Sequence, residues 1–158
     1  MNQTEYVRVV FQLPVDEDGW PPASKERLWA TRVTADTARL DNVPFFVRGF
    51  ASGDVVRIAA DQNGILWAQE AVAFSGNRTI RVIPAEDDQP GAELHTVIAA
   101  FAPLRVDGEG IEQFGLVALN VPADAPIAKV KRLLIEGEAD GRWEYEEGCV
   151  TSAWRAAA

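Results

Sequence analysis

The sequence is poor in the residues that build metal sites and disulfides. Its 158 residues include one cysteine and one histidine. A single cysteine excludes an internal disulfide, and it is typical of a protein in the reducing cytoplasm. One His and one Cys are too few for a zinc site with the usual nitrogen and sulfur ligands. We therefore expect no metal, and no residue pattern indicates a cofactor.

Long apolar runs are also missing. No window approaches the ~20 apolar residues that a membrane-spanning helix needs. Residues 1–5 lack the basic region and the following apolar run of a secretory signal. The composition, 47% hydrophobic and 25% charged, is that of a globular chain with a core. These features predict a cytoplasmic globular protein with no membrane partner.

Positive charge is scarce in the second half of the chain. The formal net charge is −9, and residues 1–84 carry nine Lys or Arg against ten Asp or Glu, whereas residues 85–158 carry six against fourteen. Phosphate contacts require clustered cations, so this imbalance predicts no nucleic-acid partner. It favours a basic protein partner, and a simple contribution of the charge to solubility is the alternative.

Short alternating segments fill the first half. Apolar and polar residues alternate as in strands over 5–13, 24–33, 37–40, 53–58, 65–74 and 79–83. Asn63-Gly64 fits a primed hairpin turn. Trp20-Pro21-Pro22 suits neither a helix interior nor a central strand, and Trp20 is interpreted as a plug over one end of a barrel. Because no helical period intervenes, we expect residues 1–77 to form a small antiparallel β-barrel.

After Pro84 and an acidic turn over 85–91, helical periods appear between strands. Leu94, Val97, Ile98 and Phe101 lie on one face of a helix. A short strand over 104–106, a loop over 107–110 and a strand over 114–121 that is apolar on both faces come next. A second helix with Asp124 as its N-cap and a last strand over 142–146 complete the pattern.

Counted from Arg78, this order of elements is that of a ferredoxin-like βαββαβ unit. The predicted fold class is therefore α+β, with the N-terminal β-barrel packed on a ferredoxin-like unit over residues 78–150. Residues 151–158 are assigned to a C-terminal tail. The barrel is expected to cover the second apolar face of the sheet.

Several motifs resemble one family of bacterial proteins. They are Leu13-Pro14 with Asp18-Gly19-Trp20-Pro21-Pro22, Glu26-Arg27-Leu28-Trp29, the run from Leu40 to Phe46, Arg48-Gly49, and Gly53 to Val56. Segments 75–81 and 137–149 are similar to it as well. The family is one of short, acidic, stand-alone proteins with a domain of unknown function. The resemblance covers nearly the whole chain and implies no activity and no residue roles.

The last predicted strand combines carboxylates with aromatic side chains. Alternation places Glu144 and Glu146 on one face and Trp143 and Tyr145 on the other. Aromatic anchors surrounded by charge are typical of protein interfaces. The candidate partner-binding residues are Glu138, Asp140, Trp143, Glu144, Tyr145 and Glu146. In the alternative interpretation, Trp143 and Tyr145 belong to the core and the carboxylates form a solvated face.

A second candidate site lies between Leu40 and Val56. Its candidate ligand-binding residues are Asp41, Phe45, Phe46, Arg48 and Asp54. Arg48 could clamp an anion beside the phenylalanines, or tie the loop to an aspartate. Asp41 and Asp54 could form a carboxylate cluster with Glu70, or Asp54 could be a turn residue that bonds to backbone N–H groups.

The sequence identifies no catalytic residue. His95 lacks a metal-ligand or catalytic partner at suitable spacing, and Cys149 is interpreted as a small buried hydrophobe. The favoured hypothesis is a non-enzymatic binding protein of immunity or antitoxin type, which neutralises a basic partner protein through its acidic C-terminal surface. The alternative is a small-molecule-binding protein or minor enzyme with a crevice near Phe45, Arg48 and Asp54.

Overall fold

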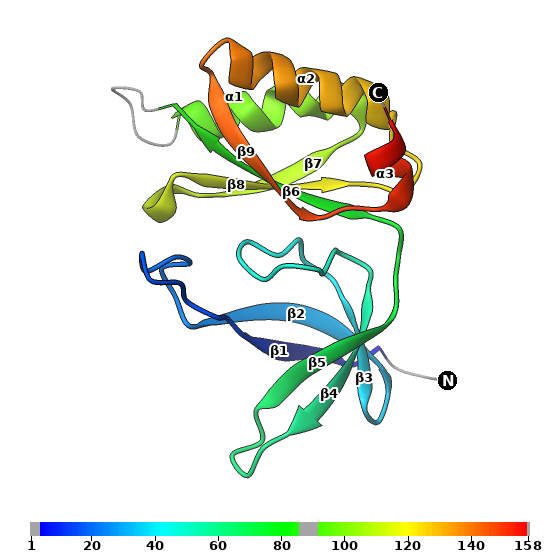
Figure 1. Ribbon diagram of the computed structural model, residues 1–158. Coiled ribbons are helices and arrows are strands. Elements are labelled where there is room, and N and C mark those ends of the chain that lie inside the picture. The colour runs from blue at the N-terminus through cyan, green and yellow to red at the C-terminus, as the bar shows by residue number, and fades with distance from the viewer. Residues whose placement is uncertain (1–3, 86–91, 158) are drawn as a thin grey trace. The chain divides into compact units, whose positions relative to one another are not determined.

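The chain is an α+β protein made of two compact units. The computed structural model describes residues 4–85 and 92–157, so the predicted acidic turn lies almost entirely outside the described residues. The first unit spans residues 1–75 and the second spans residues 76–158. Figure 1 shows strands alone in the first unit, and helices together with a sheet in the second.

The first unit is a closed barrel of five strands, which confirms the predicted small β-barrel. The strands are β1 (Tyr6–Gln12), β2 (Lys25–Thr34), β3 (Thr37–Leu40), β4 (Val55–Ala60) and β5 (Leu66–Ala73). Consecutive strands pair antiparallel, and β5 closes the barrel on β1 in parallel. The closing pair is parallel because the first and fifth strands of an up-and-down series run in the same direction. We predicted an antiparallel barrel, and this one parallel pair is the departure from that prediction.

Alternation along each strand decides which side chains fill the barrel. On β1, Val9 and Phe11 face inward, and Phe11 packs edge-on against Phe50 with ring centroids 4.8 Å apart. Val10, between them, is also buried, whereas Tyr6 and Arg8 earlier on the strand are exposed. The buried core of the barrel consists of Val9, Phe11, Leu13, Leu28, Ala30, Ala38, Leu40, Val47, Val56 and Ile58.

The second unit is a four-stranded sheet with helices. Its strands are β6 (Arg78–Pro84), β7 (Asp107–Ile111), β8 (Leu116–Val121) and β9 (Trp143–Cys149), in the order β7-β8-β6-β9 with all neighbours antiparallel. The helices are α1 (Ala92–Phe101), α2 (Ile127–Ala139) and α3 (Ser152–Ala156), and the short 3-10 helices are η1 (Ala102–Leu104) and η2 (Glu112–Phe114). Figure 1 shows α1 and α2 on one face of the sheet.

The region after α1 differs from the prediction. The predicted strand over 104–106 is wrong. Leu104 ends η1, Arg105 caps it in the left-handed conformation (φ 62°), and the strand begins only at Asp107. The glycines that indicated a loop lie in β7. A Cβ at Gly108 would lie 2.9 Å from Cδ2 of Leu119, and one at Gly110 would lie 3.1 Å from Cδ1 of Leu94. They are glycines because neighbouring side chains approach the strand closely.

Two further boundaries differ. Asp124 is not the N-cap of α2, which begins after Pro126, and its carboxylate instead pairs with Arg105 at 3.4 Å. The segment assigned to a tail contains α3. Thr151 caps this helix by accepting a hydrogen bond from the backbone N–H of Trp154, whose side chain is 1% exposed. The chain end therefore contributes an aromatic residue to the core of the second unit.

Close packing of α2 against β9 yields a test of the fold. A Cβ at Gly137 would overlap the indole of Trp143, which is held in place by its Nε1 donating to the carbonyl of Leu134 at 3.0 Å. Gly→Ala in a helix normally stabilises by ~1 kcal/mol. We expect the opposite sign for Gly137→Ala, a loss of about 2 kcal/mol from overpacking. Urea denaturation measures the change.

The matched control is Glu136→Ala, at an exposed position one residue earlier on the same helix. It should change the free energy of unfolding by less than ~0.5 kcal/mol. A Gly137→Ala variant as stable as this control would contradict the described contact between α2 and Trp143.

Candidate functional sites

The segment between β3 and β4 is held by a buried carboxylate that the sequence did not single out. Glu26 on β2 is 8% exposed. It accepts hydrogen bonds from the backbone N–H groups of Phe45 (2.6 Å), Phe46 (3.0 Å) and Val47 (2.9 Å). Buried backbone donors need acceptors, and a carboxylate can serve three of them at once. The sequence could have pointed to Glu26, because it is a charged residue at an inward position of β2.

A second buried carboxylate fixes the other end of the same segment. Asp54 is 1% exposed, and its Oδ2 accepts from the N–H of Ala51 at 3.0 Å while its Oδ1 accepts from the N–H of Ser75 at 2.8 Å. Gly53, just before it, has φ +86° and donates its N–H to the carbonyl of Leu40 at 2.8 Å. Asp54 is therefore the backbone-binding turn residue that the sequence offered as the alternative to catalysis.

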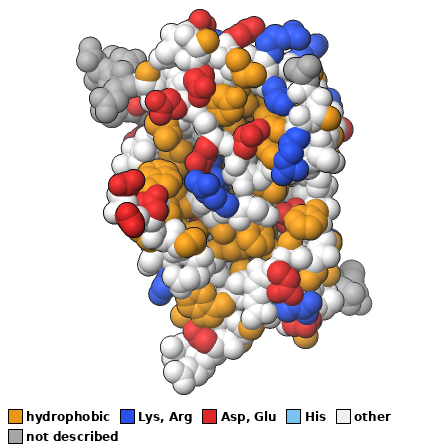
Figure 2. All heavy atoms as spheres, in the orientation of Figure 1, with side chains coloured by type: hydrophobic (Ala, Val, Ile, Leu, Met, Phe, Trp, Pro, Cys, Tyr) orange, Lys and Arg blue, Asp and Glu red, His pale blue; other side chains and the backbone are white. Residues whose placement is uncertain are grey.

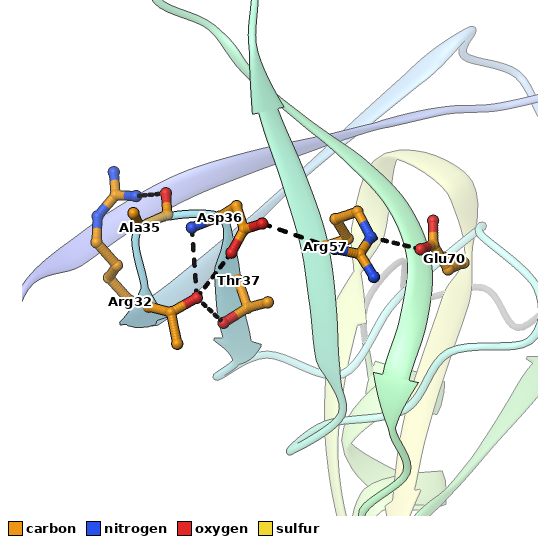
Figure 3. Close-up of polar contacts among 7 residues, drawn as sticks. Arg32, Ala35, Asp36, Thr37, Arg57 and Glu70 are labelled. Carbon is orange, nitrogen blue, oxygen red and sulfur yellow. Dashed lines mark hydrogen bonds and ion pairs between the residues drawn. The ribbon is translucent and has the colours of Figure 1, made fainter.

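The other carboxylates of the predicted cluster have partners of their own. Asp41 accepts from the hydroxyl of Thr31 at 3.0 Å, and Glu70 accepts from Nε of Arg57 at 2.6 Å. Figure 3 shows Arg57 between Glu70 and Asp36, whose Oδ2 lies 3.6 Å from Nη1 of Arg57. The hydrogen bond from Arg57 lowers the pKa of Glu70. These contacts are structural and provide no acid–base pair of carboxylates.

A cavity of about 540 Å³ opens beside the loop of the first unit. Trp20 meets Phe46 edge-on in its wall, with ring centroids 5.8 Å apart. Asp16 holds the preceding turn by accepting from the N–H of Trp20 at 2.9 Å. Of the predicted ligand-binding residues, the cavity brings together Phe46 and Arg48 and does not include the others. Its lining is Gln12, Leu13, Pro14, Asp16, Trp20, Pro21, Phe46, Val47 and Arg48.

A second cavity, of about 700 Å³, lies in the sheet unit and is called the acidic pocket below. Four of the six predicted partner-binding residues line it, together with apolar residues of β6. Trp143 is only 4% exposed and packs on Phe101 with centroids 5.6 Å apart, so it belongs to the core and forms a fixed wall of the pocket. The lining is Ile83, Pro84, Ala85, Glu138, Gly141, Trp143, Glu144 and Tyr145.

Negative charge surrounds the half-buried Tyr145 in this pocket. Burial raises the pKa of the Tyr145 phenol, and the charges of Glu138 and Glu147 raise it further. Two of the other predicted carboxylates are paired, Asp140 with Arg142 at 3.4 Å and Glu146 with the buried Arg81 at 3.2 Å. Among residues 4–85 and 92–157, Glu138 and Glu144 form no ion pair.

The remaining candidates are structural or exposed. Arg78, from the polar turn at 75–78, is 4% exposed and donates to the carbonyl of Pro122 at 2.8 Å and to the hydroxyl of Thr151 at 3.0 Å. His95 is exposed and Cys149 is half-buried. No group of three or more His, Cys, Asp or Glu side chains in the described part of the chain is placed to hold a metal ion.

Comparison with known proteins places the chain in a family. Residues 26–145 match the family described as "Domain of unknown function (DUF4265)", and the chain belongs to this family. This confirms the resemblance to a domain-of-unknown-function family. No curated protein gave a match.

A solved structure shares the fold. It is described as "Novel crystal structure of a hypothetical protein from Neisseria gonorrhoeae". The likeness has a TM-score of 0.69 at 20% identity and covers 95% of this chain and 97% of that one. At this identity it shows the fold and carries no role over to individual residues. None of the helices described is long and apolar enough to cross a membrane.

The contacts of Glu26 generate a prediction for the loop. Glu26→Ala removes the acceptor of three backbone N–H groups, one buried and two part-buried, so we expect the free energy of unfolding to fall by about 3 kcal/mol. Glu26→Gln should cost less, because Oε1, which serves Phe46 and Val47, has a counterpart in the amide. Urea denaturation measures both, with Glu17→Ala in an exposed turn as the control. Equal stability of Glu26→Ala and the control would refute this role.

Proposed function

We propose that the chain is a binding protein whose acidic pocket docks a basic protein. One observation supports this most directly, namely that Glu138 and Glu144 line a cavity of about 700 Å³ whose walls include Trp143 and Tyr145. Both carboxylates are exposed, and neither has an ion-pair partner among the described residues. The pocket therefore offers uncompensated negative charge next to aromatic and apolar surface.

A Lys or Arg side chain suits this chemistry. Its charged end would meet the two carboxylates, and its methylene stem would pack on Ile83 and Pro84. The face of Tyr145 adds a cation–π contact. Burial and the nearby carboxylates raise the pKa of Tyr145 above its usual range, so the neighbouring charges do not draw the phenol toward ionisation.

The finer part of the proposal is an immunity or antitoxin role in the cytoplasm. Residues 85–158 carry fourteen Asp or Glu against six Lys or Arg, a surplus that would speed association with a cationic toxin. For the sheet unit we further propose the ferredoxin-like class, which its strand order and antiparallel neighbours support. Packing of the barrel on the second face of the sheet stays a prediction.

The acidic pocket is tested with a fluorescent lysine oligopeptide and with pull-down of basic proteins. Glu138→Lys with Glu144→Lys should weaken peptide binding about tenfold at low salt, because two attractive charges become repulsive. Glu136→Lys makes the same kind of change at an exposed position of α2 that does not line the pocket. If the double variant and this control bind the peptide equally, the pocket is not the docking site.

A second candidate function rests on the cavity of about 540 Å³ in the barrel unit. Trp20 and Phe46 give it an aromatic wall, and Arg48 gives it a cation, as a small aromatic anion would require. This candidate is the small-molecule alternative predicted from the sequence, with a different site. Asp54 is no longer part of the site, because it is buried and bonded to backbone.

Anilinonaphthalene sulfonate, a fluorescent aromatic anion, tests the second candidate. We expect the folded protein to enhance its fluorescence, and Trp20→Ala and Arg48→Ala each to weaken binding at least about fivefold through lost stacking and lost charge. Arg132→Ala, at an exposed position of α2, is the control. Circular dichroism checks that each variant is folded. Unchanged dye binding in folded Trp20→Ala would exclude the cavity as the site.

A further inference from the structure

The outer side of the barrel has a surface rich in cations and aromatic rings, although the chain as a whole is acidic. Outward positions alternate with the core positions Val9, Leu28 and Ala30 along β1 and β2. Register places Arg8 opposite Trp29, and Arg39 of β3 opposite Thr31. The residues that gather on this side, called the basic–aromatic face below, are Tyr6, Arg8, Lys25, Arg27, Trp29, Arg39 and Trp67.

The cations of this face lack close ion pairs, although Lys25 lies near enough to Asp61 for its charge to help lower the pKa of that carboxyl. Within the residues that the structure describes, Arg8, Lys25, Arg27 and Arg39 form no ion pair with a carboxylate. Elsewhere in the same unit, Arg32 pairs with Glu5 at 3.2 Å and Arg57 pairs with Glu70 at 2.6 Å. The four unpaired cations are therefore a property of this face and not of the whole barrel.

Two of these cations lie over aromatic rings of the same face. The guanidinium of Arg8 lies 4.6 Å from the ring centroid of Trp29, and Nζ of Lys25 lies 5.5 Å from that of Trp67. Trp29 is 47% exposed and Tyr6 is 67% exposed, although apolar surface of this size is usually covered. A cation held beside an exposed ring presents a positive charge and a stacking surface to the same ligand.

A depression completes the face. A cavity of about 470 Å³ is lined by Arg8 and Arg27, with apolar walls from β1 and the start of β5. Ile65 at its edge is 36% exposed. Two arginines at one apolar depression fit a ligand that carries negative charge on a flat, largely apolar body.

We propose that the basic–aromatic face binds single-stranded nucleic acid. Unpaired bases would stack on Trp29 and Tyr6, and phosphates would lie against Arg8, Arg27, Lys25 and Arg39. A duplex keeps its bases stacked inside and has no use for the exposed rings. An acidic polypeptide would engage the cations but supplies no regular series of flat groups. Each nucleotide brings one base and one phosphate, which matches the two pairs of a ring and a cation, Trp29 with Arg8 and Trp67 with Lys25.

Two carboxylates near the face, those of Asp61 and Asp41, are held by neutral donors, which do not cancel their charge. Asp61 accepts from Nε1 of Trp67 at 2.9 Å and from the N–H groups of Asn63 and Ile65 at 2.8 and 3.0 Å, and Asp41 accepts from Thr31. Charges and apolar groups are interspersed over the side of the molecule drawn in Figure 2. Our prediction of no nucleic-acid partner rested on the acidic imbalance of residues 85–158, which does not describe this surface, where four cations lie near two carboxylates. The net charge of the whole chain is −9. It will reduce the affinity without abolishing the local attraction.

The probe is a fluorescein-labelled oligothymidine of about 16 nucleotides, the upper end of the site size of a small nucleic-acid-binding barrel. We expect saturable binding in fluorescence anisotropy. With about four phosphate contacts, the affinity should fall about 50-fold between about 50 and 200 mM salt. Trp29→Ala should weaken binding about 5- to 150-fold at constant salt, the range for one stacked base. Arg27→Glu should weaken it and also reduce the salt dependence.

Lys129→Glu, an exposed charge reversal on α2, is the matched control and should leave binding unchanged. Circular dichroism and urea denaturation identify any variant that fails to fold, and Trp29→Phe, which keeps a ring, should restore most of the affinity. Three results would overturn the proposal: no binding at low salt, equal binding of a duplex of the same length, or equal binding of polyglutamate with no effect of Trp29→Ala. The last would assign the face to an acidic protein.

Discussion

The carboxylate of Glu26 is the constraint on which the barrel unit depends. The segment from Asp41 to Asp54 has no strand or helix of its own, so its buried N–H groups require acceptors from elsewhere. Glu26 supplies them at Phe45, Phe46 and Val47, and these donors in turn stabilise a carboxylate that would otherwise be costly to bury. Loop and carboxylate therefore depend on each other, and Phe46 reaches the cavity wall because the loop is fixed.

In the sheet unit, close packing around an indole ring, and not a buried carboxylate, fixes the wall of a cavity. The indole of Trp143 is fixed by its hydrogen bond to Leu134, and Gly137 leaves the space that the ring occupies. The aromatic wall of the acidic pocket is thus part of the core, whereas Glu138 and Glu144 at the pocket are exposed. A packed apolar wall with exposed charges at its edge limits the ordering cost of binding, because only the exposed charged side chains lose conformational freedom.

Sequence periodicity predicted most of the strands because alternation follows directly from which face is buried. It failed where a residue type has two uses. Gly108 and Gly110 indicated a loop, yet they stand in β7 because Leu119 and Leu94 lie against the strand. Asp54 left a catalytic and a structural interpretation open, and its bonds to backbone N–H groups agree with the structural one. Glu26 was missed because its partners lie about twenty residues away in sequence, and only the closed barrel brings them to it.

Net charge describes no single surface of the molecule. It is a sum over the whole chain, whereas a ligand contacts one surface. In a barrel, alternate residues of a strand point to opposite faces, so each face has a charge of its own. Glu5, Glu70 and Asp36 neutralise Arg32 and Arg57 elsewhere in the unit, whereas four other cations lie on β1, β2 and β3 near Trp29. The acidic surplus of residues 85–158 belongs to the other unit. A chain with a net charge of −9 can therefore offer one surface suited to a basic partner and another suited to a polyanion, because charges on different faces are screened over about 10 Å in ordinary salt.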